Sequence, residues 1–133
     1  MCQVGDIIKI QRYQDGNKIL SKHSFVVIDD ESDKINGVSY DMICNVMSSF
    51  KDKIQRERKI SYPGNFPIVL EDRIVENDNG KEGYIKADQL YYFQKDKIRY
   101  DVIGKLEPDI FNLLIEFIEE SDFDLIDITD NLK

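Results

Sequence analysis

Short runs of β-branched and aromatic residues, separated by polar turns, fill most of this 133-residue chain. Such runs are typical of strands, and clusters such as Asp15-Gly16-Asn17 are typical of the turns between them. Short strands joined by irregular loops favour a compact antiparallel sheet or barrel. The pattern predicts strands near residues 4–11, 24–28, 40–47, 67–72, 84–93 and 97–103.

One helix is clear from the sequence, and it follows the last predicted strand. Pro108 stands where the first turn of a helix tolerates proline, and Asp109 stands where the helix dipole favours an acid. The apolar residues that follow recur at spacings of three and four, on one helix face: Ile110, Phe111, Leu113, Leu114, Phe117 and Ile118. The predicted fold is mainly β (α+β), an antiparallel β-barrel with a C-terminal amphipathic helix. Residues 51–61 fit either a short helix or an extended segment.

The length suits a single domain, predicted over residues 1–120. Residues 121–133 form an acidic tail, which either packs weakly or is flexible. No apolar run reaches about 18 residues, so no membrane span is expected. The N-terminus lacks the pattern of a signal peptide, which favours a cytoplasmic location. Cys2 and Cys44 fit neither a disulfide framework nor a metal-ligand spacing, and the chain has one histidine. Reduced thiols, no metal and no cofactor are therefore expected.

The net charge of −8 argues against a nucleic-acid partner, but the charge is unevenly distributed. Residues 107–133 hold nine acidic residues and one basic residue, so residues 1–106 are neutral overall. Within that part, residues 9–23 are locally basic, and residues 51–59 hold five basic and two acidic residues. These segments are either solvated loops or a surface for an anionic ligand, because binding depends on local potential.

Five segments, in this order, resemble the PemK/MazF toxins. Residues 5–8 (GDII) resemble the family's first strand, and residues 22–28 (KHSFVVI) resemble the second strand, which usually contains Arg-Pro. Residues 45–49 (NVMSS) resemble the end of the third strand, where the family has a Thr-Ser-like pair. Residues 84–90 (YIKADQL) resemble the strand that carries Asp-Gln, and residues 103–106 (IGKL) resemble the segment before the terminal helix.

The resemblance covers residues 4–118 and implies a PemK/CcdB-like barrel. It also implies a metal-independent endoribonuclease toxin of a toxin–antitoxin system, which cleaves single-stranded RNA (mRNA) through attack by the RNA 2′-hydroxyl. Family members are usually homodimers that a cognate antitoxin holds in check. Their chemistry requires a base for the 2′-hydroxyl proton, an acid for the leaving 5′-oxygen, and donors for the phosphate.

His23 stands where the family has its arginine, and Ser48 stands at the family's threonine position with Ser49 beside it. The resemblance makes these three the candidate catalytic residues. A histidine exchanges protons near neutral pH but carries less permanent charge than a guanidinium. Side chains near these strand ends are candidates for RNA contacts: Arg12, Lys22, Lys51 and Lys53 for the backbone, and Tyr13 and Phe50 for stacking on bases.

Each of these residues also has a simpler interpretation. A lone histidine at a strand start is often a capping or surface residue, and Ser48-Ser49 is common turn chemistry. A non-catalytic barrel that binds RNA or a protein partner is therefore the alternative function, and a gyrase-directed role, as in the related CcdB toxins, is a third. The tail at residues 121–133 is acidic and studded with apolar residues, so it is also a candidate cover for an RNA groove.

Overall fold

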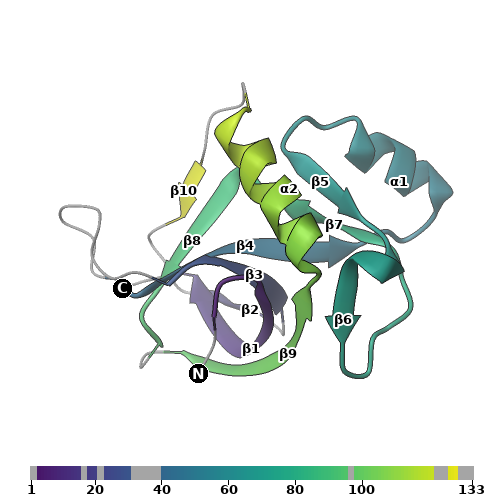
Figure 1. Cartoon of the computed structure of the whole chain (residues 1–133). Coiled ribbons are helices and arrows are strands. Elements are labelled where there is room, and N and C mark those ends of the chain that lie inside the picture. Colours follow the sequence, from purple (N-terminus) through teal and green to yellow (C-terminus); the bar gives the residue numbers. More distant parts are fainter. Residues whose placement is uncertain are drawn as a thin grey trace.

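The computed structural model describes residues 3–15, 18–20, 23–30, 40–95, 98–121 and 126–128; for residues 11–15, 18–20, 23 and 126–128 it describes the backbone alone. In the described part of the chain, strands dominate, with two α-helices and one short 3-10 helix, η1 (Figure 1). The elements are β1 (Asp6–Asp15), β2 (Lys18–Leu20), β3 (His23–Asp29), β4 (Met42–Ser49), α1 (Lys53–Ile60), β5 (Asn65–Ile68), η1 (Leu70–Asp72), β6 (Arg73–Val75), β7 (Gly83–Lys86), β8 (Gln89–Phe93), β9 (Arg99–Leu106), α2 (Pro108–Glu119) and β10 (Ile126–Ile128).

The strands form one sheet in the order β10-β8-β4-β3-β1-β9-β6, with β2 beside β1 and with β7 between β4 and β5. Every pairing in it is antiparallel except that of β10 with β8. The sheet curls into a half-barrel, and α2 lies across it (Figure 1). The sequence prediction of a mainly β fold with a closing C-terminal helix is thus confirmed.

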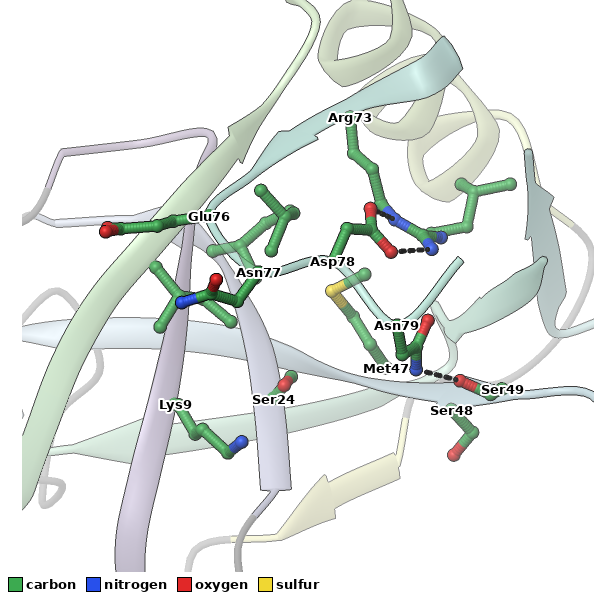
Figure 2. Close-up of a pocket in the computed structure, with 14 residues that line it drawn as sticks. Lys9, Ser24, Met47, Ser48, Ser49, Arg73, Glu76, Asn77, Asp78 and Asn79 are labelled. Atoms are coloured by element: carbon green, nitrogen blue, oxygen red, sulfur yellow. Dashed lines mark hydrogen bonds and ion pairs between the residues drawn. The ribbon is translucent and has the colours of Figure 1, made fainter. Parts of the chain in front are cut away.

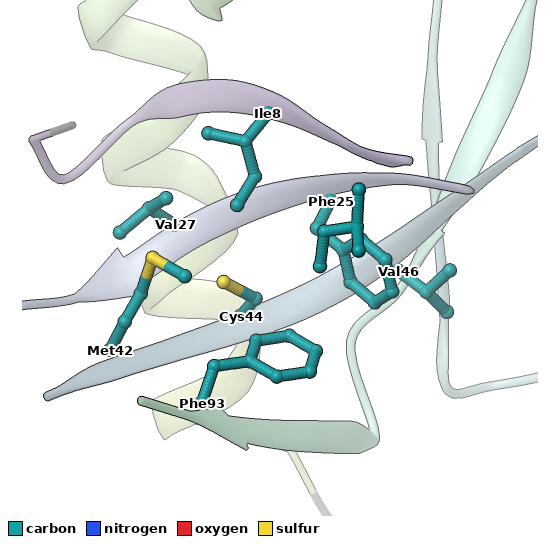
Figure 3. Close-up of a cluster of buried hydrophobic side chains, with 8 residues drawn as sticks. Ile8, Phe25, Val27, Met42, Cys44, Val46 and Phe93 are labelled. Atoms are coloured by element: carbon teal, nitrogen blue, oxygen red, sulfur yellow. The ribbon is translucent and has the colours of Figure 1, made fainter. Parts of the chain in front are cut away.

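Alternation along the central strands builds two apolar clusters, because successive side chains of a strand point to opposite faces. The first cluster has members from β1, β3, β4 and β8 (Figure 3): Ile8, Ile10, Phe25, Val27, Met42, Cys44, Val46 and Phe93. The second cluster joins the sheet to α2: Ile7, Val26, Ile68, Ile85, Ala87, Leu106 and Leu114. Neighbouring residues Ile7 and Ile8 therefore belong to different clusters.

Helix α2 has the predicted start, and four residues of the predicted apolar face pack in or against the second cluster: Phe111, Leu114, Phe117 and Ile118. The prediction is wrong for Leu113, which is 51% exposed. Pro108 occupies its first turn, and Leu114 is completely buried in the second cluster. The Phe117 ring makes an edge contact with Phe66 of β5, with ring centroids 5.3 Å apart. Within the described residues, neither helix is long and apolar enough to cross a membrane.

Helix α1 settles the choice that the sequence left open for residues 51–61. The Asp52 carboxylate accepts the backbone N–H of Gln55 at 2.7 Å, and the Gln55 side chain accepts the N–H of Lys51 at 2.6 Å. These reciprocal bonds satisfy N–H groups that a helix start leaves without partners. No residue of α1 is buried, so caps rather than packing hold this helix.

The prediction of one strand over residues 84–93 is wrong, because β7 and β8 are separated by a corner at Ala87 and Asp88. Asp88 is only 2% exposed, and its carboxylate accepts the Tyr62 hydroxyl at 2.6 Å, a contact that holds the pKa of Tyr62 above its usual value. The Ala87 N–H donates to the Gly64 carbonyl at 2.9 Å. The corner is therefore fixed by the segment that follows α1.

One further prediction differs from the structure. The predicted strand at residues 67–72 is wrong in its second half, since β5 ends at Ile68 and η1 follows. Of the tail at residues 121–133, Ser121 and the backbone of 126–128 are described, and 126–128 pair in parallel with β8. The rest of the tail lies outside the described residues.

Candidate functional site

A pocket of about 420 Å³ lies between the sheet and the loop that joins β6 to β7 (Figure 2). Apolar side chains, two of them buried and three half-buried, line one part of the pocket, and polar side chains line the rest. The apolar set is Ile7, Met47, Ile68, Val75 and Ile103. The polar set is Lys9, Ser24, Ser48, Ser49, Arg73, Glu76, Asn77, Asp78 and Asn79. The chain thus brings together residues from six strands (β1, β3, β4, β5, β6 and β9) and one loop.

A row of three residues across the central strands supplies part of this lining. Lys9 of β1 is opposite Ser24 of β3, and Ser24 is opposite Met47 of β4. Directly opposed residues share one face of a sheet, so an ammonium, a hydroxyl and a thioether lie side by side. Lys9 is half-buried, and it forms no ion pair with any residue that the structure describes. It is therefore an available cation in the pocket.

An ion pair between Arg73 and Asp78 forms the opposite wall. The guanidinium Nε donates to Asp78 Oδ2 and Nη2 donates to Oδ1, both at 2.8 Å, in a bidentate arrangement. Nη2 also donates to the Lys81 carbonyl at 2.6 Å. The Arg73 side chain is 7% exposed and that of Asp78 is 23% exposed. The charge of Arg73 is therefore matched within the wall and is not offered to a ligand.

This pair predicts a pH dependence of stability. The hydrogen bonds from Arg73 lower the pKa of Asp78 from 3.8 to about 2, with burial opposing and the Gly80 N–H assisting. Because the folded-state pKa is depressed, the contribution is complete above about pH 4 and is lost as pH falls through about pH 2. We expect Asp78→Asn to have a lower free energy of unfolding than the wild type near neutral pH, and we expect this difference to shrink as pH falls from about 4 to about 2. Urea unfolding of both proteins at a series of pH values measures the difference. A difference that stays the same at every pH would contradict the prediction.

The loop from β6 to β7 is held in shape by its own hydrogen bonds. Asn77 has a left-handed backbone with φ +55°, a conformation that asparagine tolerates better than most residues. The Asn79 amide donates to the Ser49 hydroxyl at 3.2 Å and accepts the Lys81 N–H at 2.9 Å. The Asn77 side chain has no hydrogen bond to any described residue, so its amide remains available in the pocket.

The two candidate serines do not act as a pair. Ser48 and Ser49 are consecutive in β4, and Figure 2 shows their hydroxyls on opposite sides of the strand. The Ser49 hydroxyl accepts the Asn79 amide, and Ser49 is the more exposed of the two. A single phosphate on one face of β4 would therefore contact only one of the two hydroxyls.

The remaining catalytic and basic candidates on β1 and β3 are only partly described. The backbone of His23 pairs with Ile10, and that of Arg12 pairs with Arg99, while their side chains lie outside the described part. Lys22 lies outside the described residues entirely. The catalytic role expected of His23 stays a prediction.

The candidates after β4 lie apart from the pocket lining. Lys51 and Lys53 are exposed at the start of α1, and neither lines the pocket. Phe50 is buried against Tyr84, with ring centroids 5.1 Å apart, so the prediction that it stacks on a base is wrong. The Tyr13 side chain lies outside the described part.

Sequence reasoning missed most of the pocket. Lys9, Ser24, Arg73, Asp78 and Asn79 were not singled out, although all of them line it. The one available signal was the turn cluster at residues 76–83, ENDNGKEG, which is dense in asparagine and aspartate. Such clusters mark turns, but they do not reveal which strands the turn will cover.

Within the described residues, no group of three or more histidine, cysteine, aspartate or glutamate side chains lies close enough together to hold a metal ion. A comparison with protein families finds no family model that matches this chain, and no curated protein matches its sequence. The function is therefore argued from the pocket and from the sequence resemblance alone.

Proposed function

We propose that this chain is a metal-independent endoribonuclease that cleaves single-stranded RNA near the start of β3 and the end of β4. In the proposed reaction the RNA 2′-oxygen attacks the adjacent phosphorus, and the bond from phosphorus to the 5′-oxygen breaks. His23 takes the 2′-hydroxyl proton as a base and returns it, as the imidazolium, to the leaving 5′-oxygen. Ser48 donates a hydrogen bond to a phosphoryl oxygen. The products are a 2′,3′-cyclic phosphate and a 5′-hydroxyl.

The register between β3 and β4 is the observation that carries this proposal. Ser24 is opposite Met47 and Phe25 is opposite Val46. Continuing the same antiparallel register by one residue brings position 23 opposite Ser48, and directly opposed residues on adjacent strands are within reach of each other. Because successive positions of a strand alternate between faces, positions 23 and 48 belong to the face opposite to that of Ser24 and Met47. The resemblance to PemK/MazF toxins names the same two positions, on independent grounds.

The charges around the pocket support an RNA ligand rather than exclude it. Lys9 is the available cation beside Ser24, and the exposed basic residues of α1 follow directly after β4. That helix and its start carry Lys51, Lys53, Arg56, Arg58 and Lys59. A basic surface next to a polar pocket attracts a phosphate backbone, even in a chain whose net charge is negative.

The biological setting in the proposal comes from the resemblance to PemK/MazF toxins. In this setting the protein is a cytoplasmic toxin of a toxin–antitoxin system. It acts on mRNA as a homodimer, and a cognate antitoxin restrains it. Such antitoxins cover the RNA groove of their toxins, so a basic surface beside the pocket would serve both partners. The tail is not part of this proposal, because its described residues 126–128 pair with β8, which lines no part of the pocket.

Cleavage in the presence of EDTA tests the proposal. Purified protein is incubated with a labelled single-stranded RNA pool, and mass spectrometry identifies the fragment ends. We expect 2′,3′-cyclic phosphate and 5′-hydroxyl ends, and no cleavage of the same sequences carrying 2′-O-methyl groups, which lack the nucleophile. Ends with a 3′-hydroxyl, or cleavage that EDTA abolishes, would contradict the mechanism.

A non-catalytic RNA-binding barrel is the second candidate, and one observation favours it. The guanidinium in the pocket wall is committed to Asp78, so it does not supply the permanent positive charge that the family's arginine provides. Binding of the RNA pool without any cleavage, measured on the same samples by fluorescence anisotropy, would support this candidate against the nuclease.

A further inference from the structure

We infer that the pocket under the loop from β6 to β7 is a subsite for one nucleotide, in which the loop asparagines bind the edge of the base. The inference rests on the proposed function for its RNA ligand, but its binding test does not depend on cleavage. It assigns a role to residues that lie beyond the proposed proton-transfer group: Lys9, Asn77 and Asn79.

The volume and the apolar floor suit a flat ring. Pockets for small ligands begin at about 300 Å³, so about 420 Å³ has room for one small ligand rather than a stretch of chain. Ile7 and Ile68 are 1% and 2% exposed and close the floor. Met47 lies between the two ends of the pocket in Figure 2, and its thioether makes favourable contacts with aromatic rings.

The charge balance argues against a bare anion as the ligand. The lining holds two basic residues, Lys9 and Arg73, and two acidic residues, Glu76 and Asp78. Arg73 and Asp78 neutralise each other in their bidentate pair. What remains is the Lys9 ammonium and the Glu76 carboxylate, next to apolar and amide groups. The single ammonium suits one phosphodiester attached to a neutral base, whereas the remaining carboxylate disfavours a ligand that carries several negative charges.

The asparagines supply the donors and acceptors that base recognition requires. An amide carries an acceptor oxygen and two donor N–H groups, and it binds base edges in a bidentate manner. The Asn77 amide has no partner among the described residues, and Asn79 keeps one N–H after its bond to Ser49. In Figure 2, Asn77, Lys9 and Ser24 lie at one end of the pocket, so a base bound to Asn77 brings its phosphate towards Lys9.

Titration with mononucleotides tests the binding. The four 5′-ribonucleotides, ribose 5-phosphate and inorganic phosphate are each titrated into the whole chain and followed by NMR. We expect one nucleotide to bind at least tenfold more tightly than ribose 5-phosphate, with shifts at residues of the pocket. If none binds more tightly than ribose 5-phosphate, or if the shifts lie elsewhere, the inference is overturned.

Three variants test which residues bind the base and which bind the phosphate, and the first replaces Asn77, which has a left-handed backbone. Asn77→Gly removes the amide while keeping a φ of +55° accessible, so the loop is expected to keep its fold. In Asn77→Gly, the affinity for the preferred nucleotide should fall to within threefold of the affinities for the other three. In Lys9→Ala, the affinities for all four nucleotides should fall by a similar factor. Asn112→Ala, at an exposed asparagine of α2, is the matched control and should change nothing. Unchanged base preference in Asn77→Gly would overturn the inference.

Cleavage of a randomised RNA pool separates this inference from the proposed function. If the wild type cuts RNA and Asn77→Gly cuts with the same sequence preference, the base subsite is wrong and the nuclease stands. If no RNA is cut but one nucleotide binds the pocket through Asn77, the nuclease is wrong and the subsite stands.

Discussion

Replacing His23 by alanine is expected to lower the rate of RNA cleavage by roughly 100-fold or more, because a positioned acid–base group contributes about 10²–10⁴-fold. His23 is the only histidine of the chain, so no second imidazole can take over its role. The wild-type rate should bend near pH 6.5, the usual imidazole pKa, and this bend should disappear in His23→Ala. Single-turnover cleavage between about pH 5 and pH 9 measures both effects.

Two controls separate a chemical role of His23 from a structural one. RNA affinity, measured by anisotropy, should change far less in His23→Ala than the cleavage rate, and added imidazole should restore part of the lost rate. His23→Arg introduces the residue that the PemK/MazF family carries at this position; it should keep RNA binding and lose the bend near pH 6.5. Cleavage by His23→Ala at the wild-type rate would remove the imidazole from the mechanism.

The parts of the fold that the sequence predicted are those with a strong local pattern. Helix α2 begins at Pro108 and buries Leu114, as the spacing of its apolar residues indicates. Helix α1 also has a local signal, since Asp52 and Gln55 stand three apart, as in a capping box. The sequence nevertheless left residues 51–61 open between a helix and an extended segment, because no residue of α1 is buried and the helix therefore lacks a clear apolar face.

The corner between β7 and β8 was not predictable from local sequence. Ala87 and Asp88 lack the glycine or proline that usually marks a break, so residues 84–93 look continuous. The corner depends on a partner 26 residues away in sequence, the Tyr62 hydroxyl on the Asp88 carboxylate. A buried carboxylate with a distant donor leaves no pattern in the residues next to it.

The candidate site also has a part that the sequence predicted and a part that it did not. The resemblance named His23 and Ser48, which lie on strands with a clear pattern. The pocket, which Ser24 and Met47 line from the other face of the same strands, also depends on the pairing of Arg73 with Asp78 and on the row from Lys9 to Met47. That row exists only once the register of three strands is known, and the sequence alone does not give it.

Gly104 is the glycine whose replacement should cost the most stability. It lies in β9 opposite Ile7 of β1 and Val75 of β6, so strands flank it on both sides. A Cβ at this position would overlap the Ile74 carbonyl oxygen and lie 2.7 Å from the Val75 Cα. Both are backbone atoms of a paired strand, which cannot move aside as a flexible side chain does.

We expect Gly104→Ala to lower the free energy of unfolding by about 3 kcal/mol or more, at the upper end of what overpacking costs. With a urea m-value of roughly 1–3 kcal/mol/M, the midpoint falls by about 1–3 M. Gly80→Ala is the matched control, since its Cβ meets nothing within 4 Å and only the φ of +71° opposes it; it should cost about 1–2 kcal/mol. Ile7 and Val75 both line the pocket, so Gly104→Ala should also weaken nucleotide binding. If Gly104→Ala lowers the free energy of unfolding by less than Gly80→Ala does, β6 moves aside without loss of stability and the prediction is wrong.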